Sequence, residues 1–566
     1  MHKDPSTESA AGLDKEAAAA SKDAGPVSEL KPETAPTVKP AERSRRQKTP
    51  SRGILTGVLS AVAIVAAAGA VVTAAAVTPT VVGARPLEAA LAAVPAGATQ
   101  GVCASPARLL EGSSDGTDPQ FSPESATAES AVDAVVISAP GAGLPGARLA
   151  ALNGSGSTDI KKGPDAEAPA AAAVSAGVLA GRAVSGISVL DAGAVDNNRA
   201  SAAALLRYSA TDGDLRGTAA ANCQQPANDL WLIGANTALG RTAVLTLTNA
   251  SSNAATVNLE LFGAEGQIQA PGSRGLLVAP GTSRSIVLAG LAPNEKSLSV
   301  HVRSAGGPVA AVIQQSVLRG LQPGGVDYIS PGAGQGVRQV MTGVDIQDPA
   351  GIASMTAKKG FSDAGPVLYL TVPGPTDAVV EVKLFGRDGQ KALPAGGVVT
   401  AKAGSVTEVP LAGVPAGQYT VSASSDVSFV ASSRVTRGTN PDEPSDVSWS
   451  PSSPRLGSQH LVPVPSKGDR FLVVGALDSR AAVTYTPVTA DGRIHEAGTA
   501  DIAGGTTASI AVPKEVAGSA VTAYIVSAAG DAAYGALVLQ DGSGISTVAL
   551  TAGAEGQERV PVRLGY

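Results

Sequence analysis

A short alternation of apolar and polar residues that ends in a turn occurs three times in the second half of this chain. In each copy one polar residue separates successive apolar residues, and a turn containing glycine follows. A period of two is typical of a half-buried β-strand, and an Asp-Gly pair is typical of a hairpin turn. The copies are Val257, Leu259 and Leu261 with Glu265-Gly266; Val380, Val382 and Leu384 with Asp388-Gly389; and, more weakly, Val483 and Tyr485 with Asp491-Gly492.

Glycines recur at the same spacing in the first two copies. Gly266 and Gly389 are 123 residues apart, and Gly281 and Gly404 are also 123 apart. Repeats of roughly 20–50 residues build solenoids or propellers, whereas units of about 100 residues match a two-sheet sandwich. We therefore expect separately cored β-domains, joined by similar segments at 327–331 and 446–451.

The pattern predicts an all-β protein of tandem immunoglobulin-like β-sandwich domains, preceded by one transmembrane helix and a disordered tail. Residues 101–228 contain strand-like pieces but are less regular. The expected order is a cytoplasmic tail (1–53), a transmembrane helix (54–77), a linker (78–100), a divergent β-domain (101–228), and sandwich repeats at 229–335, 336–455 and 456–566.

The membrane prediction rests on residues 54–77, a run of 24 residues without a charge. At about 1.5 Å per residue this run would span the ~30 Å hydrocarbon layer. Five basic residues lie between positions 43 and 52, so the N-terminus should face the cytoplasm and the bulk of the chain should be extracellular, at the plasma membrane. A cleaved signal peptide ending near Ala74-Ala75-Ala76 is the alternative, although such apolar cores usually have ~7–15 residues.

The tail should be disordered, because residues 1–53 contain no Phe, Trp or Tyr and are rich in Ala, Pro and charged residues. The two cysteines, Cys103 and Cys223, both follow the membrane segment. An oxidising exterior makes a disulfide between them plausible. Its loop of about 120 residues would give on the order of 4–5 kcal/mol in the chain-entropy model. The alternative is two free thiols.

The composition limits the classes of molecule that we expect the protein to bind. The net charge of −6 over 566 residues argues against a nucleic-acid surface, which needs concentrated Lys and Arg. Aromatic residues make up only 3% of the chain, so there are few rings for stacking on sugars. The remaining expected partners are the lipid bilayer, through residues 54–77, and either an envelope protein or a glycan.

No motif predicts a catalytic, cofactor or metal site. The segment Gly141-Ala142-Gly143-Leu144-Pro145-Gly146 matches G-x-G-x-x-G, but its proline and the lack of a following helix favour a turn. Asp212-Gly213-Asp214 lacks the further ligands of a calcium loop and is typical of a hairpin turn. The histidines His301, His460 and His495 are far apart in sequence, and a G-x-S-x-G elbow is absent. We expect His301 to point outward from a strand.

The large aromatic residues have two interpretations. Trp231 and Trp449 could stack on a ligand, although packing at domain ends is the commoner role of such rings. Phe262 and Phe385 follow the alternating strand at equivalent positions. They should close the core of their own sandwich.

Four segments resemble an actinobacterial family of membrane-anchored secreted proteins, known only as a domain of unknown function. The resemblance covers most of the chain beyond about residue 100. It implies an envelope location and carries over no catalytic or binding residue. The segments are Trp231-Leu232-Ile233-Gly234, the run 240–249, the run 300–304 and Gly325-Val326-Asp327-Tyr328.

These observations favour a non-catalytic, membrane-anchored extracytoplasmic scaffold or adaptor that binds another envelope protein through its β-sandwich surfaces. The first alternative is a protein that binds carbohydrate or a cell-wall polymer. The second is a cell-wall hydrolase, whose catalytic residues would have to come from distant segments.

Overall fold

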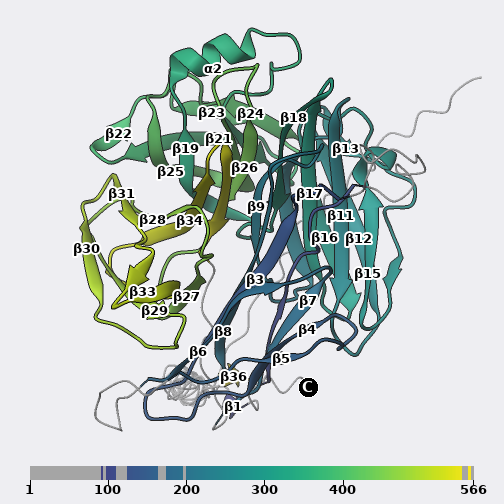
Figure 1. Cartoon of the computed structure of the whole chain (residues 1–566). Helices are drawn as coiled ribbons and strands as arrows, with labels where there is room; N and C mark the ends of the chain where they lie inside the picture. Colours follow the sequence, from purple (N-terminus) through teal and green to yellow (C-terminus); the bar gives the residue numbers. More distant parts are fainter. Residues whose placement is uncertain are drawn as a thin grey trace, which may run out of the picture. The chain divides into compact units, whose positions relative to one another are not determined.

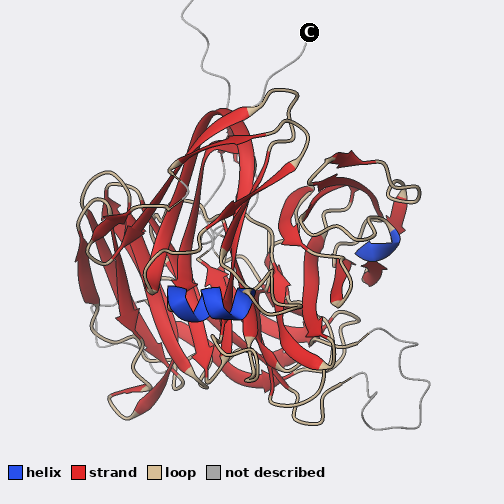
Figure 2. Cartoon of the chain, turned by 90° about the horizontal axis from the view of Figure 1, so that it is seen from above, coloured by secondary structure: helices blue, strands red, loops and turns tan. Residues whose placement is uncertain are grey.

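The computed structural model describes residues 91–93, 97–109, 124–163, 174–195, 199–394, 396–550 and 559–561. The predicted tail (1–53) and transmembrane helix (54–77) lie outside these residues. Within the described part of the chain, no helix is long and apolar enough to cross a membrane. Strands dominate these residues, and the α-helix α2 (Pro349–Thr356) is short (Figure 2). The all-β class is therefore confirmed.

Apart from one small two-stranded sheet, the described strands form four pairs of sheets, and each pair encloses a cluster of buried apolar side chains. We number the pairs I to IV along the chain. In each pair we count the main strands from one to seven in chain order. The first, fifth and third of them form one sheet, here called the 1-5-3 sheet. The fourth, second, sixth and seventh form the other, called the 4-2-6-7 sheet. The order recurs in all four pairs, including residues 101–228.

The bounds of pairs I and II are as follows (Figure 1). Pair I contains β2 (Thr99–Val102), β3 (Glu129–Ile137), β4 (Ala147–Ala151), β6 (Ala176–Ala183), β7 (Ser188–Ala192), β8 (Ser201–Ala210) and β9 (Gly217–Asn222), with β5 (Thr158–Asp159) beside β4. Pair II contains β10 (Asp229–Ala235), β11 (Arg241–Asn249), β12 (Ala255–Gly263), β15 (Thr282–Val287), β16 (Leu298–Gly306), β17 (Ala310–Arg319) and β18 (Gln322–Ile329), with β13 (Gly266–Ile268) and β14 (Leu276–Val278) beside β12.

In pair III one long strand, β25, supplies both the fifth and the sixth positions. Pair III contains β19 (Gly336–Ile346), β20 (Val367–Thr371), β21 (Ala378–Gly386), β24 (Val406–Pro410), β25 (Gly417–Arg437) and β26 (Asp446–Pro451), with β22 (Gly389–Lys391) and β23 (Val398–Ala401) beside β21. Pair IV contains β27 (His460–Pro463), β28 (Asp469–Ala476), β29 (Ala481–Thr489), β31 (Thr506–Ala511), β33 (Ser519–Gly530), β34 (Ala533–Asp541) and β35 (Gly544–Ala549), with β30 (Gly498–Ile502) beside β29 and β32 (Glu515–Val516) beside β33. Separately, β1 (Leu91–Ala93) pairs with β36 (Arg559–Pro561).

The repeated alternation that opens each copy is the third strand of its pair. β12 and β21 show the same sequence of buried and exposed positions along their nine residues. Gly263 pairs with Gly266 and Gly386 pairs with Gly389, so each strand ends in a two-residue hairpin. The strand order differs from that of a constant-type immunoglobulin domain, which places its first, second, fifth and fourth strands in one sheet.

Successive pairs pack against one another through equivalent positions. Phe262, the eighth residue of β12, packs with Val367 and Tyr369 of pair III. Phe385, the eighth residue of β21, packs with Leu477 of pair IV. The prediction that these rings close their own sandwich is therefore wrong. Each is buried, but the next pair along the chain covers it.

The cycle of contacts closes, because pair IV packs on pair I. Val488, the eighth residue of β29, lies in one buried cluster with Val135 and Ile137 of β3. Pairs I and II join through both apolar and polar contacts. Val312, Val326 and Tyr328 of pair II lie in the core cluster of pair I, and the Tyr328 hydroxyl donates to the Ser105 carbonyl at 2.7 Å. The four pairs therefore form a closed ring, each touching the next.

Two glycines allow the first strands of pairs II and III to approach the next pair closely. Gly234 and Gly343 interrupt the ladders of β10 and β19 as bulges, with φ of 94° and 78°. A Cβ on Gly343 would lie 2.8 Å from Val538 Cγ2 of pair IV. Both the backbone conformation and the space at these positions therefore require glycine.

We expect Gly343→Ala to destabilise the protein more than Gly404→Ala. Gly404 has a similar φ of 67°, but a Cβ there would meet nothing within 4 Å. Backbone strain is thus common to both variants, and overpacking adds about 1–3 kcal/mol only at Gly343. Urea unfolding of the two variants measures the difference. Equal losses would contradict close packing between pairs III and IV.

Candidate functional site

The seventh strands of the four pairs meet at the centre of the ring. β9 contacts β18, β18 contacts β26, β26 contacts β35, and β35 contacts β9. We call this arrangement of β9, β18, β26 and β35 the hub. Several of its side chains and backbone groups form part of the wall of a cavity to which all four pairs contribute. The hub therefore positions the candidate site.

The carboxylate of Asp446, in β26, connects the hub strands. Its Oδ2 accepts hydrogen bonds from the backbone N–H of Thr218 in β9 at 2.8 Å and of Ile545 in β35 at 3.0 Å. Its Oδ1 accepts from Val326 in β18 at 3.1 Å and from Val447 at 3.0 Å. One buried side chain of pair III therefore binds backbone groups of pairs I, II and IV.

Glycines make the approach to Asp446 possible. A Cβ on Gly217 would lie 2.6 Å from Asp446 Oδ1, and a Cβ on Gly325 would lie 2.3 Å from the same atom. At Gly544, beside Ile545, a Cβ would lie 2.3 Å from the Thr218 hydroxyl oxygen. A side chain at any of these three positions would displace a hub strand.

A second buried carboxyl, that of Asp327 in β18, also connects the strands. Its Oδ2 accepts from the backbone N–H of Trp449 at 3.0 Å, and its Oδ1 accepts from the Ser546 hydroxyl at 2.8 Å. The Ser546 hydroxyl oxygen in turn accepts from the N–H of Ala220 at 2.9 Å. Burial raises the pKa of Asp327 to about 8 and raises the pKa of Asp446 well above its usual range, while the hydrogen-bond donors oppose both shifts.

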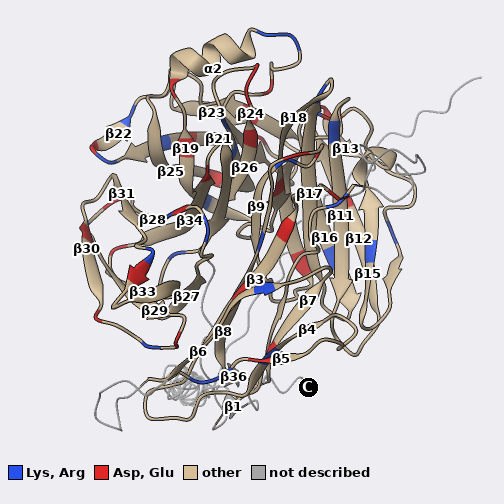
Figure 3. Cartoon of the chain, in the orientation of Figure 1, with Lys and Arg blue, Asp and Glu red and all other residues tan. Residues whose placement is uncertain are grey.

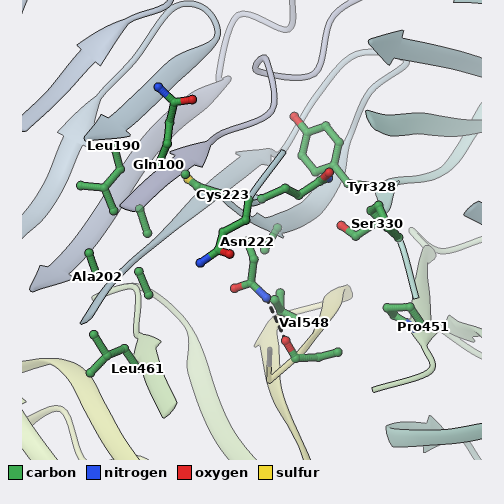
Figure 4. Close-up of a pocket in the computed structure, with 18 of the residues that line it drawn as sticks. Gln100, Leu190, Ala202, Asn222, Cys223, Tyr328, Ser330, Pro451, Leu461 and Val548 are labelled. Atoms are coloured by element: carbon green, nitrogen blue, oxygen red, sulfur yellow. Dashed lines mark hydrogen bonds between the residues drawn. The ribbon is translucent and has the colours of Figure 1, made fainter. Parts of the chain in front are cut away.

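The cavity has a volume of about 290 Å³ and lies where the hub strands end. All four pairs contribute to its wall. Figure 4 shows Leu190, Ala202 and Leu461 on one side and Tyr328, Ser330 and Pro451 on the other. The full lining is Thr99, Gln100, Gly101, Leu190, Ala202, Ala203, Ala204, Ala220, Asn222, Cys223, Gln224, Gln225, Leu230, Tyr328, Ser330, Pro331, Pro451, Leu461, Thr547, Val548 and Ala549.

The lining is apolar with carboxamide and hydroxyl groups, and it includes no acidic or basic side chain. Asn222 reaches across from β9 and donates from Nδ2 to the carbonyl of Ala549 at 2.8 Å, which fixes its orientation (Figure 4). Gln224 exchanges two hydrogen bonds with the backbone of Ala311, at 2.8 and 3.1 Å. These contacts hold the polar groups on rigid strands, as a preformed binding site requires.

The disulfide predicted between Cys103 and Cys223 is present, and Cys223 lines the cavity. It links the segment after β2 to the segment after β9. Gly101 fits against it, since a Cβ there would lie 3.3 Å from the Cys223 carbonyl oxygen. The covalent link thus fixes one wall of the cavity to the hub.

The proposed ligand-stacking role of Trp231 and Trp449 is wrong for this structure. Each is only 2% exposed, so neither ring can reach a ligand in solution. Trp449 donates from Nε1 to the Gly234 carbonyl at 3.0 Å and packs into the core of pair II. Trp231 stacks on His301 with ring centroids 4.0 Å apart. Both rings fill the contact between pairs II and III.

The three histidines that the structure describes do not form a cluster. His301 is not outward but buried, held by Glu260 at 2.8 Å and by Asp229 at 3.0 Å. His460 and His495 lie in pair IV, and His495 Nε2 contacts the Thr489 hydroxyl at 2.8 Å. That threonine is fully buried, so it cannot act as a nucleophile.

The two weak motifs form turns, as expected. Residues 141–146 run directly from β3 to β4, with no helix between them, and residues 212–214 join β8 to β9. Within the ranges that the structure describes, no cluster of His, Cys, Asp or Glu could hold a metal ion. No motif in the sequence therefore predicted the cavity. An aspartate two residues from a glycine, as in Gly325-Val326-Asp327, is the feature of the hub that the sequence displays.

The sequence matches one family, described as a family of unknown function (DUF5719), over residues 178–513, which is more than half of the chain. The matched segment includes three hub strands, β9, β18 and β26. Comparison with curated proteins and comparison with solved structures gave no match.

We expect Asp446→Asn to destabilise the folded protein by about 2–4 kcal/mol, because the amide nitrogen would face two backbone N–H donors and leave them without an acceptor. Asp442→Asn is the control, since Asp442 is exposed and precedes the same strand. The free energy of unfolding of both variants, measured with urea, tests this. A loss at Asp446 no larger than at Asp442 would contradict the central role of that carboxylate.

The raised pKa of Asp327 predicts a pH dependence. Between about pH 4 and pH 8 the folded protein retains a proton on Asp327 that the unfolded chain has released. This group's contribution to stability therefore falls as the pH rises through that range. Relative to Asp327→Asn, in which Ser546 can accept from the amide, the native protein should lose stability between pH 5 and pH 8. Parallel curves for the two proteins would refute the shift.

Proposed function

We propose that this chain, which belongs to the family of unknown function matched above, is a non-catalytic, membrane-anchored scaffold or adaptor outside the cytoplasm. It holds a short segment of another envelope protein in the hub cavity. The observation that carries the proposal is the cavity itself. It has a volume of about 290 Å³ and is lined by all four sheet pairs without an acidic or basic side chain.

The lining favours an uncharged peptide segment. Carboxamides such as Gln100, Asn222 and Gln225 can donate to and accept from a peptide backbone. The apolar side chains, among them Leu190 and Leu461, can bury one side chain of the partner. A charged segment would lose its hydration there without gaining an ionic partner, at a considerable cost.

A glycan is a weaker candidate for the same cavity. Sugar sites commonly offer aromatic faces, and Tyr328 is the single aromatic residue of the lining. Its ring is only 4% exposed, and its hydroxyl already donates to Ser105. The two buried tryptophans lie elsewhere.

The finer architecture is part of this proposal. Each sheet pair is taken as a β-sandwich of immunoglobulin-like size with its own strand order, supported by the shared core within each pair. Residues 54–77 are taken as an uncleaved anchor that leaves the ring outside the plasma membrane, supported by 24 uncharged residues behind a basic flank. The disulfide between Cys103 and Cys223 is compatible with an oxidising exterior.

The test is to fill the cavity. Ala202→Phe places a ring inside it, whereas Ala482→Phe places the same ring on the exposed face of β29. With a photo-crosslinking residue at the exposed position Gln225, we expect the full-length protein in its own membranes to capture one reproducible partner. Capture should fall at least about tenfold in Ala202→Phe, as expected for a blocked contact, and should persist in Ala482→Phe.

Two outcomes would reject the proposal. The first is the absence of a reproducible partner, and the second is equal capture by the two phenylalanine variants. Recovery of a wall polymer in place of a protein, with the same sensitivity to Ala202→Phe, would assign the cavity to the glycan alternative.

A further inference from the structure

Three arginines surround one aspartate at the contact between pairs II and III. Arg241 donates from Nε to Asp363 Oδ2 at 2.7 Å, and its Nη2 lies 2.7 Å from the same oxygen. Arg319 Nη1 lies 3.1 Å from Asp363 Oδ1. Arg434 donates from Nη2 to the backbone carbonyls of Asp363 and Gly365. The third guanidinium therefore reaches the cluster without a carboxylate of its own.

The cluster has more positive charge than negative. Three guanidinium groups face one carboxylate, and the side chains of Arg319 and Arg241 are 2% and 9% exposed. The charged groups that act on Asp363 are these same three arginines, which hold its pKa below the usual range against the effect of burial. Two positive charges thus remain uncompensated in a partly buried place, where they are poorly hydrated.

Two of these arginines line a small cavity and carry a donor without a hydrogen-bond partner. The Nε groups of Arg319 and Arg434 are buried and have no hydrogen-bond partner among the residues that the structure describes. Both side chains line a cavity of about 10 Å³, together with Arg241, Asp363, Asn236, Gln315, Val317, Val447 and Trp449. That volume is about the size of one water-sized occupant.

We propose that this cavity binds a monatomic anion of chloride size, which neutralises part of the excess charge and fixes pair II to pair III. Charge selects an anion over water, because the donors are guanidinium N–H groups and an unpaired buried charge is costly. Size selects a halide over phosphate or sulfate, whose tetrahedral oxyanions exceed the cavity. This excess of positive charge is confined to the cluster, because acidic and basic residues are otherwise interspersed over the sheets (Figure 3).

Bromide tests the site directly. Crystals of the full-length protein grown in bromide should give an anomalous peak within about 3.5 Å of the Nε atoms of Arg319 and Arg434, as expected for a halide accepting from N–H donors. The contrary results are an empty cavity and density without an anomalous signal, which is what water would give. Either result would overturn the proposal.

A solution experiment provides a second readout that does not need crystals. At constant ionic strength, replacing gluconate by chloride should raise the melting temperature of the native protein by about 1–3 °C, because a ligand that binds only the folded state stabilises it. Arg434→Gln should lose most of this increase. Arg303→Gln, which removes one positive charge from an exposed position of pair II, should keep it.

The variant Asp363→Asn should show a larger increase in melting temperature with chloride, in contrast to Arg434→Gln. It removes the only carboxylate of the cluster, so the melting temperature should depend on chloride more strongly than in the native protein. If Arg434→Gln proves too unstable to study, this variant still decides the question. An equal chloride response in the native protein, Arg303→Gln and Asp363→Asn would show a general salt effect and refute a specific site.

Discussion

The structure depends on how one buried carboxylate is satisfied. Asp446 is buried at the centre of the ring, and its four hydrogen bonds come from backbone N–H groups of all four sheet pairs. Each carboxyl oxygen left without such donors would lose the hydrogen bonds that water gives it in the unfolded chain, at a cost of about 1–3 kcal/mol. The strands must therefore approach within hydrogen-bonding distance at one point, and Gly217 and Gly325 are required there because a Cβ would occupy the same space. The cavity wall is built on these strands, so its shape depends on the same interaction.

The core of each pair also contains a side chain from the next pair, and these links follow the ring in one direction. Trp449 of pair III lies in the cluster of pair II, and Tyr328 of pair II lies in that of pair I. Ile545 of pair IV lies in the cluster of pair III, and Leu205 of pair I lies in that of pair IV. The repeat pattern of the sequence predicts separately cored β-domains. The structure instead gives each pair a core that is completed by its neighbour, which favours cooperative unfolding of the ring over independent unfolding of its parts.

The sequence pattern predicted the features that depend on neighbouring residues or on a simple count of residues. The alternation at Val257, Leu259 and Leu261, the two-residue hairpins, and the disulfide between the only two cysteines all follow from short-range geometry or from simple counting. The neighbours of Phe262 and Phe385 could not be predicted, because hydrophobicity shows that a ring is buried but not which sheet covers it. The cavity was invisible for a related reason. Its wall combines the ends of strands from four pairs, and each residue alone, such as Ala202 or Asn222, is unremarkable in its own segment.

Ring closure also constrains how the protein can be made. The last hub strand, β35 (Gly544–Ala549), supplies the Ile545 donor to Asp446, yet a ribosome delivers it after nearly all of the preceding chain. Until it emerges, Asp446 lacks one of its four donors. The pair IV residues that cover Val135 and Ile137, such as Val488, have by then already been made. A premature stop shortly before residue 544 would therefore leave the hub without its fourth strand and Asp446 without the Ile545 donor.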